Sequence, residues 1–134
     1  MFDKIYCDAM GKLTLRLTVG MLMLFHGVAK IIHPGALEFI GSNLSSIGMP
    51  SGIAYGVYLG EVIAPLMVIA GIYTRIGGLI IVVTMVFAVG LVHMGDIFSL
   101  SKHGGWMLEL QAFYLLGGLS VALLGSGKIA IKPD

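Results

Sequence analysis

The chain has 134 residues, of which 57% are hydrophobic and only 11% are charged, and its mean hydropathy is +0.99. This composition excludes an ordinary soluble domain and is typical of an integral membrane protein in contact with membrane lipid. The formal charge of +1, without a basic block, gives no reason to expect a nucleic-acid partner. Cys7 is the only cysteine, which excludes an intrachain disulfide, a Cys-x-x-Cys redox pair and a thiolate metal cluster.

Four apolar segments predict four membrane-spanning helices, because one span needs roughly 20 residues to cross a hydrocarbon core of about 30 Å. After the first span the composition shifts to Gly, Ser, Asn and Pro, and residues 36–40 are apolar enough for a short helix at the membrane interface. The fold expected is an all-α membrane protein, a four-transmembrane-helix bundle with a short interfacial helix in the first extracytoplasmic loop. We expect a single domain over 1–134. Its spans are expected at about 13–32, 54–73, 76–92 and 106–124.

The basic residues predict the orientation of the bundle. Six of the eight Lys and Arg residues fall on the side of the N-terminus: Lys4, Lys12, Arg16, Arg75, Lys128 and Lys132. Because Lys and Arg are enriched in cytoplasmic segments, we expect a multi-pass protein of the cell (inner) membrane with both termini in the cytoplasm.

Four ionisable residues are predicted to lie in the outer half of the bilayer. At 1.5 Å per residue, His26 lies roughly 9 Å and Glu61 roughly 10 Å below the outer ends of their helices. Glu109 comes one turn into the fourth span, and His93 closes the third. Charged groups inside a span are costly and usually face a bundle interior, so these residues predict a polar pocket.

The first span carries three polar residues on one face, since Arg16, His26 and Lys30 fall within an arc of about 80°. Arg16 and Lys30 could instead extend to opposite membrane interfaces with only their aliphatic stems buried. His26 could handle protons or ligand in the pocket, or simply form a hydrogen bond to a neighbouring helix.

Glu61 combines a carboxylate with a nearby helix break. Pro65 lacks the N–H group that would bind the main-chain carbonyl of Glu61, so a donor such as Lys30, His26 or water is expected close to that oxygen. Apolar surroundings favour the neutral acid and make Glu61 a candidate proton carrier. The alternative is a structural ion pair between Glu61 and Lys30 with a local kink.

Other polar and aromatic residues are less specific. A carboxylate in the first helical turn, as at Glu109, is stabilised by the helix dipole without any further role. The His93-x-x-Asp96 spacing is too common to indicate a metal site, and we predict none. Trp106, with tyrosines of the second span, is expected in an aromatic belt at the outer interface. Arg16, Pro65, Arg75 and Trp106 are assigned structural roles.

The sequence resembles the DoxX family of small four-span bacterial membrane proteins over nearly its whole length. The resemblance rests on several short motifs taken together: Arg16-Leu17, Leu24-Phe25-His26-Gly27-Val28-Ala29-Lys30, Gly60-Glu61, Gly71-Ile72-Tyr73-Thr74-Arg75, Val92-His93, Gly104-Gly105-Trp106 and Leu124-Gly125-Ser126-Gly127-Lys128. It implies association with quinone-linked oxidoreductase systems, although the family is functionally mixed and supplies no agreed catalytic residues.

Three functions remain open at this point. The first is a redox-associated subunit that binds a quinone or another small ligand in a pocket of His26, Lys30, Glu61, His93 and Glu109. A partner protein of a redox complex would supply the redox centre, because the sequence has no flavin, haem or iron–sulfur motif. The second is a non-enzymatic membrane chaperone or assembly factor, for which Gly77, Gly78 and Gly90 provide smooth patches for helix contact. The third is a small-solute or metal transporter, which would require a homo-oligomer.

Overall fold

The computed structural model describes the backbone of residues 2–134 and the side chains of residues 7–134, so the side chain of Lys4 lies outside the described part. The protein is helical, and the expected all-α membrane architecture is confirmed. The helical elements are α1 (Phe2–Ile32), α2 (Gly35–Ser46), η1 (Ser51–Tyr55), α3 (Gly56–Tyr58), η2 (Leu59–Ile63), α4 (Ala64–Ala70), α5 (Thr74–Val92), η3 (Met94–Asp96) and α6 (Glu109–Leu124).

Within the described residues, three helical segments are long and apolar enough to cross a membrane: Cys7–Ile32, Ser51–Ala70 and Thr74–Val92. The fourth apolar helix, α6, has 16 residues. At 1.5 Å per residue α6 is roughly 24 Å long, a little short of the usual hydrocarbon thickness. It begins at Glu109 rather than at Trp106, because residues 97–108 form a loop.

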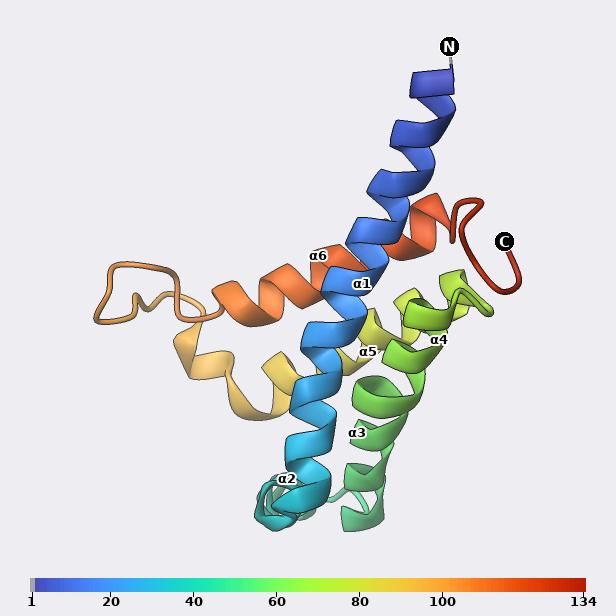
Figure 1. Ribbon diagram of the computed structural model, residues 1–134. Coiled ribbons are helices and arrows are strands. Elements are labelled where there is room, and N and C mark those ends of the chain that lie inside the picture. The colour runs from blue at the N-terminus through green and yellow to red at the C-terminus, as the bar shows by residue number, and fades with distance from the viewer. Residues whose placement is uncertain (1) are drawn as a thin grey trace.

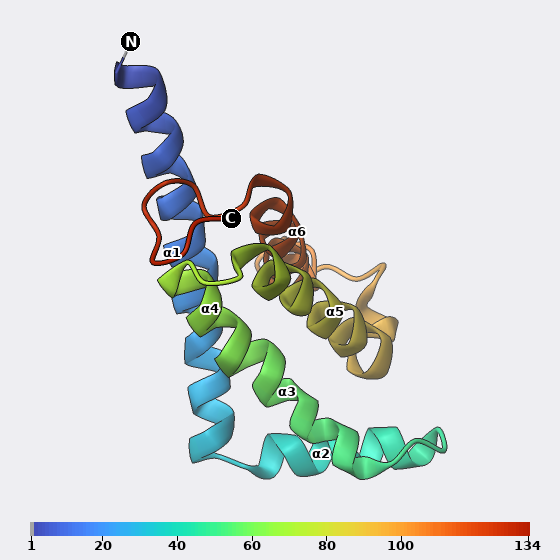
Figure 2. The same ribbon diagram turned by 90° about the vertical axis from the view of Figure 1, so that its right-hand side faces the viewer.

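The helices do not all run parallel to one another. α1 is long and straight, and the segment from α3 to α4 runs beside it, with α2 at its lower end (Figure 1). α5 and α6 form a helical hairpin that crosses α1 at a steep angle, and Figure 2 shows α6 nearly end-on when α1 stands upright. The core forms where these two layers meet and contains Val19, Met23, Val68, Ile81 and Val121, all nearly inaccessible to solvent.

Glycines allow the helices to approach closely at this crossing. A methyl group on Gly78 of α5 would lie 2.6 Å from the carbonyl oxygen of Gly118 on α6, and one on Gly118 would lie 2.9 Å from the carbonyl oxygen of Gly78. Gly77 packs against Val68 of α4. Gly90 is different: it has no neighbour within 4 Å, so it makes no helix contact within the described chain.

The turn between α4 and α5 is made by two residues with left-handed backbone conformation, Gly71 (φ 77°) and Tyr73 (φ 47°). Residues of the C-terminal tail run beside this turn. The amides of Ile131 and Lys132 donate to the carbonyls of Ala70 and Gly71 at 3.0 and 2.9 Å, respectively. The tail is therefore an ordered part of the fold that joins the end of α4 to the region beyond α6.

Candidate functional site

An ion pair between Lys30 and Glu61 connects α1 to η2. The Nζ atom of Lys30 lies 2.9 Å from Oε1 and 2.8 Å from Oε2 of Glu61, and it donates a hydrogen bond to Oε1. Only 7% of the Glu61 side chain is exposed, against 21% of the Lys30 side chain. A buried charge requires a partner of opposite sign, and Lys30 supplies it.

Glu61 lies in the middle of a π-helical turn, η2, and Pro65 is the second residue of α4, which follows directly. The sequence predicts a break at this place because Pro65 has no N–H group, and the structure accommodates the break by widening the helix locally. The amide of Ala64 accordingly reaches back to the carbonyl of Leu59. Such π turns often occur at functional sites, because they alter the direction of the side chains that they carry.

The main-chain carbonyl of Glu61 faces Gly27 of α1, with no room for a side chain between them. The sequence predicts Lys30 as one possible donor to this carbonyl. In the structure Lys30 binds the carboxylate of Glu61 instead. The Lys30 carbonyl, in the last turn of α1, accepts a hydrogen bond of 3.3 Å from the Tyr58 hydroxyl. Tyr58 thus helps to hold the end of α1 against α3.

A cavity of about 560 Å³ adjoins the ion pair between α2, α5 and the segment from η1 to η2. Lys30, Glu61 and His93, three of the predicted pocket residues, line it together with Thr84. The other lining side chains are apolar, and several of them are also exposed on the outer surface of the protein: Phe39, Ile53, Leu79, Val83 and Phe87. The cavity is therefore open at the surface of the protein. Its size is in the range of small-ligand pockets.

His26 does not line the cavity. Its ring packs edge-on against Tyr114 of α6, with the ring centroids 5.6 Å apart. His26 therefore belongs to a polar–aromatic contact between α1 and α6 and not to the ion pair.

His93 at the end of α5 has two polar neighbours. Its Nδ1 lies 3.3 Å from Asp96 Oδ2, and its Nε2 lies 3.4 Å from the amide nitrogen of Gln111 on α6. Glu109 is exposed at the start of α6, near Gly105, and does not line the cavity. No group of three His, Cys, Asp or Glu side chains suited to a metal ion occurs in the described part of the chain.

Comparison with known proteins identifies the family. The DoxX family model matches residues 11–94, which are more than half of the chain and include both partners of the ion pair. The chain belongs to the DoxX family. It is 32% identical over 124 residues to a Bacillus subtilis protein named "Putative oxidoreductase CatD", covering 92% of this chain and 85% of that protein. It is 29% identical over 120 residues to an uncharacterized protein of Haemophilus influenzae, covering 87% of this chain and 84% of the relative. No solved structure matches it significantly.

In this DoxX protein the side chain of Arg16 is buried. Its guanidinium group donates to four main-chain carbonyls, those of Val68 and Ile69 near the end of α4 and those of Ser126 and Ile129 in the tail, at 2.5–3.1 Å. Only 1% of Arg16 is exposed, so its side chain is packed within the protein. It neutralises the C-terminal end of a helix dipole and holds the tail in place.

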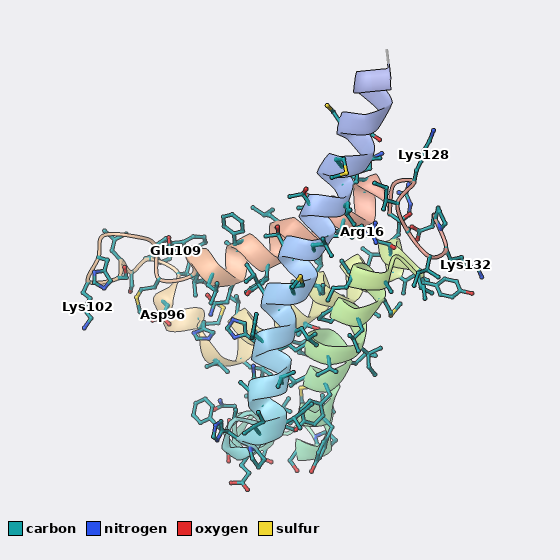
Figure 3. All side chains as sticks on the ribbon, in the orientation of Figure 1. Arg16, Asp96, Lys102, Glu109, Lys128 and Lys132 are labelled. Atoms are coloured by element: carbon teal, nitrogen blue, oxygen red, sulfur yellow. The ribbon has the colours of Figure 1, made fainter. Side chains whose placement is uncertain are left out.

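Arg75 has a related role at the end of α6. Its Nη1 donates to the carbonyls of Ala122 and Leu123 at 3.0 and 2.9 Å, and its amide donates to the Asp134 carboxylate at 3.1 Å. In Figure 3, Lys128 and Lys132 lie to the right of Arg16, whereas Asp96, Lys102 and Glu109 lie on the left-hand side, on the other side of α1.

Sequence reasoning missed several features of the DoxX site. Thr84 lines the cavity and packs against Gly60, and Gln111 contacts His93, but neither residue carries a sequence signal beyond its polarity. The basic residues of the tail give no indication that it packs into the fold, although Ser126 is fully buried. Trp106 donates to the carbonyl of Ile97 at 2.7 Å and so closes the loop before α6.

Proposed function

We propose that this DoxX protein binds a quinone in the cavity beside Lys30 and Glu61 and handles protons for a quinone-linked oxidoreductase system. The observation that carries the proposal is an ion pair on the wall of a cavity that is otherwise mostly apolar. An isoprenoid quinone has the matching chemistry, with an apolar tail that travels in lipid and a polar ring that needs donors and acceptors. The name of the Bacillus subtilis relative, an oxidoreductase, is in keeping with this proposal.

The proposed chemistry divides between this chain and a partner. Reduction of a quinone to a quinol takes up two electrons and two protons. The electrons would come from an electron-carrying partner protein of the redox complex. A protonated Glu61 could donate one proton to a ring oxygen, and Lys30 could bind that oxygen while stabilising the carboxylate left behind; the second proton would reach the other ring oxygen from water. The reverse steps would serve quinol oxidation.

A second candidate, a membrane chaperone or assembly factor, has one observation in its favour. Gly90 on α5 is exposed and has no neighbour within 4 Å. A glycine on a lipid-facing surface provides a place where a helix of another protein could pack closely. In that case the ion pair would serve only to hold α1 against η2.

Substitution of Glu61 by Gln tests the proposal. Glu61→Gln keeps the size of the side chain and removes its charge, so a proton-handling role predicts a folded protein with little bound quinone and no quinone-linked activity. Glu38→Gln is the matched control, because Glu38 is exposed on α2 and does not line this cavity. Quinone extracted from each protein would be quantified beside its melting temperature. Equal quinone and equal activity in the two variants would refute the proposal and favour the second candidate.

A further inference from the structure

Tyr73, in the turn between α4 and α5, has a backbone conformation that a tyrosine rarely adopts. Its φ is +47°, and among the described residues other than glycine it alone has a positive φ. This left-handed conformation is unfavourable for a residue with a side chain, and such strain is often kept at functional sites. Tyr73 is also 53% exposed. The turn therefore presents an aromatic ring at the surface at some cost to the backbone.

Lys132 of the C-terminal tail lies over this ring. Its main chain pairs with Ile72 in a parallel bridge, and its amide donates to the carbonyl of Gly71 at 2.9 Å. These bonds place the Nζ atom of Lys132 5.0 Å from the centroid of the Tyr73 ring. The ring attracts the ammonium group through a cation–π interaction and covers one side of it.

The other side of the Lys132 ammonium is available to a ligand. Among the described side chains, residues 7–134, no carboxylate lies within ion-pair distance of Lys132. The carboxylate of Asp134 instead accepts from the amides of Arg75 and Ser126. An ammonium group has three N–H donors and the ring accepts none of them as a full hydrogen bond, so Lys132 can bind an anion.

The position of the turn indicates which anion is at hand. The turn separates two apolar segments that are long enough to cross a membrane, Ser51–Ala70 and Thr74–Val92. A turn between two spans lies at a membrane surface. Ile131, next to Lys132, is 73% exposed. An exposed apolar side chain beside a lysine and a tyrosine is typical of a segment at the level of the lipid head groups.

We infer that Tyr73, Ile131 and Lys132 form a binding site for an anionic phospholipid. The phosphate group of the lipid accepts hydrogen bonds from Lys132 Nζ on the side away from the ring, and Ile131 lies among the acyl chains. A zwitterionic lipid binds more weakly, because its own cation lies next to its phosphate. None of the three residues lines the cavity beside Lys30 and Glu61, so the site does not depend on the proposed function.

The fold holds this site in place before a lipid binds. The Arg16 guanidinium donates to the carbonyl of Ile129, and the amide of Ile131 donates to the carbonyl of Ala70 at 3.0 Å. The tail therefore loses little conformational freedom when it binds a lipid, and the attraction between Lys132 and the phosphate is not spent on ordering it.

The experiment titrates the full chain in a non-ionic detergent with dioleoyl phosphatidylglycerol and with dioleoyl phosphatidylcholine. Native mass spectrometry gives the affinity of the first bound lipid. A lysine near an anionic lipid surface contributes about fivefold to binding. We expect phosphatidylglycerol to bind at least that much more tightly than phosphatidylcholine. Inorganic phosphate at millimolar concentration should not displace it, because phosphate has no acyl chains to contact Ile131.

A matched pair of lysine variants assigns the preference to the tail. Lys132→Gln keeps the main-chain bonds of the tail and removes the charge, so the preference for phosphatidylglycerol should fall below about twofold. Lys102→Gln is the control, because Lys102 is an exposed lysine in the loop before α6, and it should leave the preference unchanged.

Two further variants separate lipid binding from stability. Tyr73→Gly suits the left-handed backbone and should not lower the melting temperature, whereas the affinity for phosphatidylglycerol should fall by about threefold or more through loss of the ring. Ile131→Ser should weaken both lipids to a similar extent and leave the preference between them unchanged.

Three results would overturn the inference. The first is equal affinity of the unaltered protein for the two lipids, a comparison that needs no variant to fold. The second is a preference for phosphatidylglycerol that persists in Lys132→Gln. The third is displacement of phosphatidylglycerol by inorganic phosphate together with no effect of Ile131→Ser, which would identify a site for a free anion instead of a lipid.

Discussion

Gly27 of α1 lies directly against the main-chain carbonyl of Glu61 on η2, so close that a methyl group on Gly27 would overlap both atoms of that carbonyl. A second glycine on α1, Gly20, meets α4 in a similar way, at Ile69 and the carbonyl of Pro65. These contacts bring α1 near enough to η2 for Lys30 to reach the Glu61 carboxylate. The ion pair therefore depends on the absence of a side chain one turn before Lys30.

Gly27→Ala is expected to destabilise the protein by about 1–3 kcal/mol, because the added methyl group must push α1 away from η2. Gly11→Ala is the matched control on the same helix. Gly11 has no neighbour within 4 Å, so alanine there should leave stability unchanged or raise it by up to about 1 kcal/mol. Melting of the two variants in detergent gives the comparison, and equal melting temperatures would contradict the close packing described at Gly27.

Lys30→Met should cost about 3 kcal/mol, because it leaves the nearly buried Glu61 carboxylate without its counter-charge. The double variant Lys30→Met/Glu61→Gln removes both charges and should recover at least half of that loss. Lys12→Met breaks an ion pair with Asp8, of which 61% is exposed, and should cost less than about 0.5 kcal/mol. Thermal unfolding in one detergent would rank the three proteins, and no recovery in the double variant would show that the pair is not coupled.

Arg16→Lys should loosen the C-terminal tail. A lysine ammonium cannot reproduce the planar arrangement of donors with which Arg16 binds carbonyls from α4 and from the tail. The tail amides of Ile131 and Lys132, which donate to the end of α4, should exchange with solvent at least about tenfold faster. Lys128→Met, an exposed substitution, should leave their hydrogen exchange unchanged. Unchanged exchange in Arg16→Lys would mean that the tail is held without the guanidinium group.

The orientation in the membrane can be tested through Cys7, which is a free and exposed thiol near the N-terminus. Because basic residues gather at the end of the molecule that holds the tail, we expect both termini in the cytoplasm. A membrane-impermeant maleimide should label Cys7 in inverted vesicles and not in intact cells, and a reporter fused after Asp134 should be active only in the cytoplasm. Labelling of intact cells would invert the predicted topology.

The sequence alone determined the features that depend on local composition and on distance along a helix. Apolar segments predicted the helices of a membrane protein, since the burial of apolar side chains in lipid does not require a particular neighbour. Pro65 predicted a break after Glu61, because the missing N–H group acts within its own helix. Helical rise alone predicted similar depths for His26 and Glu61, whereas the ion pair with Glu61 is made by Lys30, one turn further along α1.

The tertiary structure decided which side chains meet. The sequence places His26 and Lys30 on one face of α1. In the folded protein α1 packs against both α4 and α6. Lys30 therefore reaches Glu61, while His26 packs against Tyr114. Arg16 looked equally suited to the membrane interface or to the interior. Its burial was settled by Ser126 and Ile129, tail residues more than a hundred positions away, whose carbonyls reach Arg16 only after the chain has folded back. Such contacts arise from packing between distant segments, and no pattern within one helix can specify them.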